Sequence, residues 1–191
     1  MLVFAGLGNP GVSHAQQRHN IGFMAVDAVH GRYRFDAWRT RFQGLAAEGR
    51  IGDAKVLLLK PATFMNDSGR SVAEALRFYK LGPDALTVFY DELDLAPMKV
   101  RVKHGGGAAG HNGIRSLDAH TGSEYRRVRL GIGHPGHKDR VLGYVLGNFA
   151  KAEAEPLTAL LDAVAAEVPW LIAADDARFV SEVARRLAPP D

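Results

Sequence analysis

The chain opens with Leu2-Val3-Phe4-Ala5-Gly6, and Leu7-Gly8-Asn9-Pro10-Gly11 follows directly. The apolar run up to Gly6 predicts a short buried strand, and the glycines and proline after it predict a tight loop. After a mostly polar stretch, 12–19, apolar side chains recur at helical spacing from Ile21 to Val29, which predicts a helix that begins near His19 or Asn20. A strand, a loop and a helix in this order form the first unit of an α/β fold.

Strands and helices continue to alternate along the chain. Apolar, β-prone runs predict strands at 42–50, 55–60, 85–90, 98–103 and 125–131, and the first two form a hairpin around 51–54. Helical spacing predicts a helix through Tyr79 that Asn66 or Ser68 caps, a short helix over 112–120, a long helix with Pro156 in its first turn, and a last helix capped by Asp175 or Asp176. We therefore expect residues 1–191 to form one α/β domain: a twisted mixed β-sheet flanked by α-helices, with a helical C-terminal region.

The composition excludes several classes of protein. The chain has 191 residues, 47% of them apolar, which is enough to bury one core. It has no cysteine, so disulfides, thiolate nucleophiles and thiolate-bound metal centres are excluded. No apolar run reaches the roughly 18–20 residues that span a bilayer, and the N-terminus lacks the charged region of a signal peptide. We expect a cytoplasmic protein that does not enter a membrane.

The positive charge is concentrated in one part of the chain. The net charge is +3, but residues 1–150 hold 20 basic and 13 acidic side chains, and 99–140 hold nine basic and three acidic ones. A stripe of this kind is either a solvated face or a surface for a phosphate-rich partner, because Lys and Arg neutralise backbone phosphates. The sequence leaves both readings open.

Three enzyme classes find little support. Gly6-Leu7-Gly8-Asn9-Pro10-Gly11 matches the dinucleotide pattern G-x-G-x-x-G, but the helix starts too late and no acidic residue ends a second strand. Ser68 is not in a G-x-S-x-G nucleophile elbow. His134-Pro135-Gly136-His137 could ligate a metal, but a proline–glycine turn between histidines is usually only a turn. We expect no metal and no cofactor.

One imidazole, one carboxylate and three carboxamides stand where predicted strands or loops give way to the next element. They are His19, Asp91, Asn9, Asn66 and Asn112. His19 at a helix start and Asp91 at a strand end can both reach the carboxyl edge of the sheet, where α/β sites form. A carboxylate that binds one imidazole nitrogen leaves the other free as a base. Taken singly, each residue could be a cap or a turn residue; together they suit hydrolysis of a polar ester or amide without a metal.

Four ordered segments carry a resemblance to a known family. They are Gly8-Asn9-Pro10-Gly11 with Arg18-His19-Asn20, Pro61-Ala62-Thr63-Phe64-Met65-Asn66, Asp91-Glu92-Leu93-Asp94, and Gly110-His111-Asn112-Gly113; Arg129-Leu130-Gly131-Ile132-Gly133-His134-Pro135 adds a fifth. In this order the chain resembles the bacterial-type peptidyl-tRNA hydrolases from Leu2 to about Leu146. The resemblance implies a monomeric esterase that frees peptide and tRNA from peptidyl-tRNA.

The resemblance also assigns residues to roles. His19 is implied as the general base that activates water, or acts through the substrate 2′-hydroxyl, and Asp91 as its orienting partner. Asn9, Asn66 and Asn112 are implied in substrate positioning, and Met65 in the wall of the peptide groove. Lys103 and Arg129, with Arg101 beside them, match positions that meet tRNA phosphate. His14 stands where the family usually has a tyrosine at the tRNA end. A non-catalytic RNA-binding protein on the same scaffold is the rival class.

Overall fold

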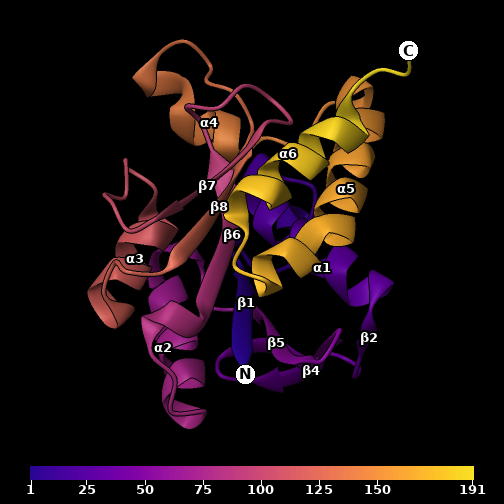
Figure 1. Cartoon of the computed structure of the whole chain (residues 1–191). Helices are drawn as coiled ribbons and strands as arrows, with labels where there is room; N and C mark the ends of the chain where they lie inside the picture. Colours follow the sequence, from indigo (N-terminus) through magenta and orange to yellow (C-terminus); the bar gives the residue numbers. More distant parts are fainter.

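β1 (Leu2–Gly6) is the middle strand of an eight-stranded sheet in the computed structural model, which describes residues 1–191 (Figure 1). The strand order is β2-β4-β5-β1-β6-β8-β7, and β3 pairs with β4. The remaining strands are β2 (Arg34–Phe35), β3 (Arg39–Arg41), β4 (Gly44–Ile51), β5 (Ala54–Pro61), β6 (Leu86–Glu92), β7 (Val100–His104) and β8 (Arg126–Gly131). All strands of the chain, from Leu2 to Gly131, therefore belong to one sheet.

The four central strands run parallel and share one carboxyl edge. β1 pairs in parallel with β5 on one side and β6 on the other, and β6 pairs in parallel with β8. β4 and β7 flank this core as antiparallel strands. The chain leaves β1 for a helix (Ile21–Arg32) on one face of the sheet and leaves β5 for a helix (Ser68–Phe78) on the other face. The carboxyl edge where such connections diverge is the usual place for a site in such sheets.

Helices cover both faces of the sheet. α1 (Ile21–Arg32), α5 (Ala154–Ile172) and α6 (Asp176–Leu187) share one apolar core with Phe4 and Phe89, whereas α2 (Ser68–Phe78) and α3 (Asn112–Thr121) share the other with Val3 and Ala5. Figure 1 shows the two groups of helices on opposite sides of the strands. Alternate residues of β1 thus feed two cores, as the period of two in a strand requires. None of the helices is both long and apolar enough to cross a membrane.

Close packing of α1 fixes where the loop after β1 can go. Gly22, in the first turn of α1, has room for no side chain: a Cβ atom there would lie 2.2 Å from the Phe89 carbonyl oxygen and 2.5 Å from the Leu7 nitrogen. The same contact is visible from β1, where a Cβ on Gly6 would lie 2.1 Å from the Gly22 oxygen. The start of α1 is therefore pressed against β1 and β6, which brings the residues just before it to the carboxyl edge.

The predicted fold class is confirmed: a mixed sheet flanked by helices, with a helical C-terminal region. The hairpin, the predicted strands and the five predicted helices lie within a few residues of where periodicity placed them. The predicted cap of α2 is wrong, because Asp67 holds the N-cap position and no side chain bonds the helix there. The cap at Asp175 is confirmed, since its carboxylate accepts from the Arg178 N–H at 3.0 Å. β2, β3 and α4 (Val141–Val145) were not predicted.

Candidate active site

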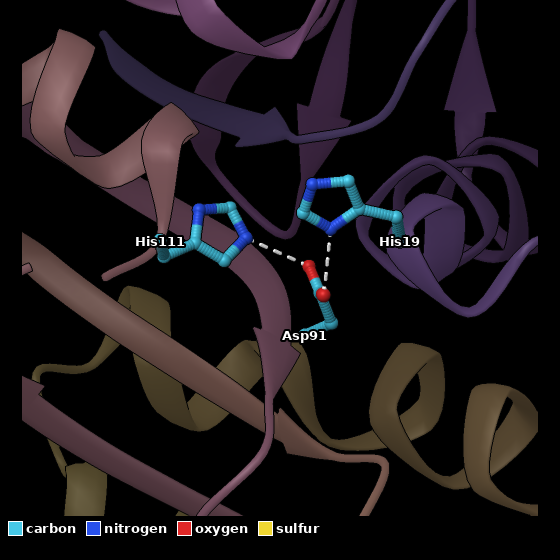
Figure 2. Close-up of side chains that lie close together, drawn as sticks. All are labelled: His19, Asp91 and His111. Carbon is cyan, nitrogen blue, oxygen red and sulfur yellow. Dashed lines mark hydrogen bonds and ion pairs between the residues drawn. The ribbon is translucent and has the colours of Figure 1, made fainter. Parts of the chain in front are cut away.

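Asp91 accepts hydrogen bonds from two histidines at the carboxyl edge of the sheet (Figure 2). Its Oδ2 lies 2.7 Å from Nδ1 of His19, and its Oδ1 lies 2.8 Å from Nε2 of His111. The carboxylate is 1% exposed, while the two imidazoles keep 13% and 10% of their surface. The predicted pair of His19 and Asp91 is therefore in contact, and a second imidazole completes the group.

Three different elements deliver these side chains. Asp91 is the last residue but one of β6, His19 lies in the 3₁₀ turn Arg18–Asn20 that runs into α1, and His111 is the N-cap of α3. The two imidazole rings lie side by side, with centroids 5.0 Å apart. Because α1 packs closely against β6, His19 and Asp91 meet here although they are 72 positions apart in the sequence.

Opposing effects act on the pKa of Asp91. Burial raises it, but the charge and hydrogen bonds of His111 and His19 outweigh burial and hold the pKa of the carboxyl well below its usual range. Asp91 is consequently an ionised acceptor at neutral pH. A carboxylate has no proton to give, so each imidazole must present an N–H to it. In its neutral form, His19 then carries its proton on Nδ1, which leaves the lone pair of Nε2 free.

His111 is the functional residue that sequence reasoning missed. Its Nε2 donates to Asp91, and its Nδ1 accepts from the Ile114 backbone N–H at 3.3 Å, which is the N-cap bond of α3. The ring also packs edge-on against Tyr90, whose pKa burial raises to about 12. Both nitrogens of His111 are therefore occupied, so His19 is the imidazole with a free nitrogen. The sequence signal lies in Gly110-His111-Asn112-Gly113, but the sequence interpretation took Asn112, and not His111, as the polar residue directly before the helix.

The three side chains are close enough to be considered as metal ligands. The nitrogens that face Asp91 lie at hydrogen-bond distance from its oxygens, 2.7 and 2.8 Å, and a zinc ion needs roughly 2 Å to each ligand atom. An ion between them would have to push the groups apart and displace both N–H protons. The donor set therefore fits a hydrogen-bonded base and carboxylate better than a metal centre.

A cavity of about 320 Å³ opens in front of this group. His19, Asp91, His111 and Asn112 line it on one side, and Val141 and Val145 of α4 line it on another. His134 and Lys138 add polar and charged groups at its edge. A small polar ester could enter from solvent and place its carbonyl carbon near His19.

Arg18 fixes the segment that carries His19. Its guanidinium donates to the Asn148 carbonyl oxygen at 2.9 Å and lies over the ring of Tyr144, 4.4 Å from its centre. Its backbone N–H donates to the Gly147 oxygen at 3.0 Å. These contacts join the segment of His19 to Tyr144 of α4 and to the residues that follow this helix, and α4 also supplies a wall of the cavity.

Asn9, in the loop after β1, mainly supports the local backbone. Its Oδ1 accepts from the Met65 N–H at 2.8 Å, and its backbone N–H and C=O bond the carboxamide of Asn20, both at 2.9 Å. Asn9 and Met65 are buried, so the structure brings these two predicted residues together. Only the NH₂ group of Asn9 remains available for a ligand.

The two other predicted asparagines are exposed. Asn66 follows Met65 in the 3₁₀ turn before α2 and caps no helix. Asn112 is the first residue of α3 and lines the 320 Å³ cavity, while its Oδ1 accepts from Arg115 at 3.2 Å. The interpretation of Asn112 as a cap is wrong, because His111 holds that position. The sheet edge thus gathers His19, Asp91, Asn112, Asn9 and Met65 in one region, with Asn66 next to Met65.

Comparisons with known proteins agree with this geometry. A family model described as peptidyl-tRNA hydrolase matches residues 3–189. This chain belongs to the peptidyl-tRNA hydrolase family. A peptidyl-tRNA hydrolase of Rhizorhabdus wittichii is 64% identical over 188 residues, which cover 98% of this chain and all of the relative, and one of Erythrobacter litoralis is 61% identical over 98% and 99%. The crystal structure of the peptidyl-tRNA hydrolase of Acinetobacter baumannii superposes with a TM-score of 0.90 at 38% identity, covering 96% of this chain and 94% of that one.

The basic residues to which the peptidyl-tRNA hydrolase resemblance gave a tRNA role share one face of the sheet. Arg101 and Arg129 are direct cross-strand partners on β7 and β8, and Lys103 lies two residues further along β7. Arg101 is exposed, Lys103 is half-buried, and Arg129 faces Glu92 at 3.6 Å. Arg127, opposite Lys103, is instead fully buried and bonds Asp118 and the carbonyls of Gly106 and Gly107. One member of the basic stripe is therefore structural.

His14 lies in the 3₁₀ turn Val12–His14, near the exposed ring of Phe64. The two rings meet edge to face with centroids 6.5 Å apart, and Nδ1 of His14 is buried without a partner. His14 and Phe64 thus form an aromatic pair at the loop after β1. The structure does not bring His14 into contact with His19 or Asp91.

Proposed function

We propose that this chain hydrolyses the ester bond between peptide and tRNA in peptidyl-tRNA, with His19 as general base, Asp91 as its orienting partner and water as nucleophile. One observation carries the assignment of the base. His19 and His111 both bind Asp91, but only His19 has a ring nitrogen with no hydrogen-bond partner, and His19 lines the 320 Å³ cavity.

The proposed reaction uses this free nitrogen directly. Nε2 of His19 takes a proton from water as the water oxygen attacks the ester carbonyl carbon, and the imidazolium that forms is stabilised by ionised Asp91. The tetrahedral intermediate then collapses, and the proton returns from His19 to the 3′ ribose oxygen as the C–O bond breaks. Peptide leaves with a carboxyl group and tRNA with a free 3′-hydroxyl. No covalent enzyme intermediate is needed.

The carboxamides would bind the substrate around the ester. The Asn9 NH₂ group, Asn66 and Asn112 are available to bond the peptide amide and the developing oxyanion, since a carboxamide both donates and accepts. Recognition of a backbone amide would favour N-substituted aminoacyl esters over free aminoacyl esters, which carry an α-ammonium instead. Met65, which is buried beside Asn9, would form the apolar wall of the peptide groove.

Peptidyl-tRNA would place its phosphates on the basic face of β7 and β8. Lys103 and Arg129 are proposed to contact phosphate, with Arg101 beside them and His14 at the far side of the site. We further propose that residues 1–191 act as one domain, as a monomer, in the cytoplasm, without a cofactor. The single sheet and the family match over residues 3–189 support this proposal.

The test measures release of N-acetyl amino acid from N-acetyl-aminoacyl-tRNA in the presence of EDTA. The native chain is expected to release it, and His19→Ala to lose about 10²–10⁴-fold in kcat while still binding tRNA. His30→Ala is a matched control, because His30 lies on α1 and bonds the Asp36 oxygen instead of Asp91. Binding of tRNA without hydrolysis by the native chain would favour the RNA-binding class, and equal loss of binding and turnover in His19→Ala would remove His19 as the base.

A further inference from the structure

A second cavity lies at the same carboxyl edge, on the other side of the loop that follows β1. It has a volume of about 240 Å³ and lies between the end of β5 and the first turns of α1. Its lining includes Asn9, Asn20, Phe23, Leu45, Lys60 and Pro61. The two cavities share no lining residue, but Asn20 directly follows His19 in the chain.

The sheet order places this cavity on the flank opposite the basic face. Along the sheet, β5 lies on one side of β1, whereas β6, β8 and β7 lie on the other. His19 and Asp91 belong to the β1–β6 centre, and Lys103 and Arg129 belong to β7 and β8. If the tRNA phosphates lie over β7 and β8 and only the tRNA 3′ end reaches His14, the peptide half can extend from the ester towards β1 and β5, where the 240 Å³ cavity opens.

The loop Asn9–Gly11, which lines the second cavity, is held firmly in place. The carboxamide of Asn20 bonds both backbone groups of Asn9, and Asn9 in turn holds Met65. The adjoining Gly8 is packed so closely that a Cβ there would lie 2.8 Å from the ring of Phe23. A peptide that crosses the Asn9 loop would therefore meet a fixed pocket mouth next to it.

The walls of this pocket suit an apolar side chain. Phe23, Met24, Leu45 and Pro61 provide the apolar surface. Lys60 is only 14% exposed, because Asp27 binds it at 2.6 Å and its Nζ lies 4.5 Å from the centre of the Trp38 ring. Asp27 also lines the pocket and is 48% exposed, so the carboxylate is the more accessible member of this ion pair. An acidic side chain would be repelled by this carboxylate, whereas an apolar side chain would not.

We propose that this 240 Å³ cavity is a subsite for a side chain of the peptide, upstream of the esterified residue, and that it selects apolar over acidic side chains. The inference rests on the proposed function. It adds that the enzyme distinguishes peptides by their sequence, through residues of α1, β4 and β5, in addition to distinguishing peptides from free amino acids.

The test compares three substrates that share the same esterified residue and the same tRNA: N-acetyl-aminoacyl-tRNA, and two acetyl-peptidyl-tRNAs extended by leucine or by glutamate residues. The native chain is expected to favour the leucine peptide over the glutamate peptide by about 10-fold in kcat/KM, the range of a single apolar pocket contact. Leu45→Trp, at a partly exposed position, should fill the pocket and remove this preference, while leaving N-acetyl-aminoacyl-tRNA hydrolysis unchanged. Leu45→Met is the volume-matched control and should behave as the native chain.

Asp27→Asn provides a second test of the subsite that does not depend on filling the pocket. It removes the exposed negative charge and should raise kcat/KM for the glutamate peptide alone. The subsite is refuted if Leu45→Trp slows all three substrates equally, or if neither variant changes the ratio of leucine to glutamate peptide. Failure of the native chain to hydrolyse N-acetyl-aminoacyl-tRNA would refute the proposed function instead, so the two failures are distinguishable.

Discussion

Nη2 of Arg18 lies 3.2 Å from Oε2 of Glu153, although 135 residues separate them in the chain. Glu153 also accepts from the Ala150 backbone N–H at 2.9 Å, so it ties Arg18 to the start of α5. Arg18 precedes His19 and also lies over the ring of Tyr144 in α4, the helix that supplies Val141 and Val145 to the cavity, so the contacts of Arg18 hold the segment of His19 against the opposite wall.

Arg18→Ala is therefore expected to lower kcat by about 10-fold with little change in KM, because small displacements of a catalytic group are costly. Arg18→Lys should recover part of the loss, since it keeps the charge but not the forked donor. Steady-state kinetics on N-acetyl-aminoacyl-tRNA would measure the split. Arg50→Ala, at an exposed position on β4, serves as the control for loss of an arginine; a rise in KM with unchanged kcat in Arg18→Ala would mean that Arg18 binds substrate instead.

Asp91→Asn should reduce turnover by about 10²–10⁴-fold while keeping the shape of the site. An asparagine can donate its NH₂ to Nδ1 of His19, which would move the imidazole proton to Nε2 and block the base. Protonation of Asp91 should not limit the activity of the native chain in the ordinary carboxyl range, because the pKa of this group lies well below its usual range. A normal rate in Asp91→Asn would contradict the orienting role.

The same substitution changes how stability depends on pH. The pKa of Asp91 is depressed in the folded chain, so its contribution to the free energy of unfolding is complete above the unfolded pKa of about 3.9 and is lost as pH falls towards the folded value. Urea unfolding below about pH 4 should therefore show a weaker pH dependence in Asp91→Asn than in the native chain. Identical slopes would mean that the carboxyl is not held ionised by folding.

Much of the fold could be predicted because its signals are local. The apolar run before Gly6, the hairpin around Gly52-Asp53 and the periodicity of α1, α5 and α6 each depend on neighbouring residues. β3 and α4 could not be predicted, because Arg39–Arg41 has no apolar alternation and Val141–Val145 is too short for a periodic signal. The prediction of the α2 cap failed because α2 continues directly from the 3₁₀ turn Met65–Asp67, and no side chain caps either element.

The site could be predicted only where the type of a residue and its place in a local element indicate its chemical role. His19 and Asp91 were found because one follows a predicted loop and the other ends a predicted strand. The role of His111 depends on where the N-terminus of α3 lies relative to β6, and that is a tertiary relationship. Likewise, Arg127 counted as part of a basic surface until the structure placed it against Asp118 in the interior.

His111→Ala should lower kcat much less than His19→Ala, by about 10-fold, because His111 has no free nitrogen to act as a base. The loss has two sources: Asp91 loses one donor and α3 loses its N-cap bond. His111→Gln can still donate to Asp91 and should recover activity in part. Steady-state kinetics of the variants decide the matter: a loss of kcat in His111→Ala as large as that in His19→Ala would assign the base to His111.

Gly22→Ala is expected to destabilise the fold severely, since its Cβ would overlap the Phe89 carbonyl and the Leu7 nitrogen, both of which are backbone atoms that cannot turn aside. Overpacking of this kind typically costs about 1–3 kcal/mol or more. Gly31→Ala, in the same helix but with no atom within 4 Å, should instead be neutral or stabilising by up to about 1 kcal/mol. Thermal unfolding of both variants would test this, and equal Tm values would show that α1 does not depend on the close contact.

Lys103→Ala and Arg129→Ala should each weaken tRNA binding and flatten its salt dependence by about one unit in the slope of log K against log salt, one phosphate contact each. Arg129 requires care, because its removal also leaves Glu92 without its partner beside Asp91. Arg129→Lys keeps the charge and should keep most of the slope. Arg50→Ala, on the opposite flank of the sheet, should leave the slope at the native value; if it flattened the slope as much as Lys103→Ala, the tRNA would not be confined to the face of β7 and β8.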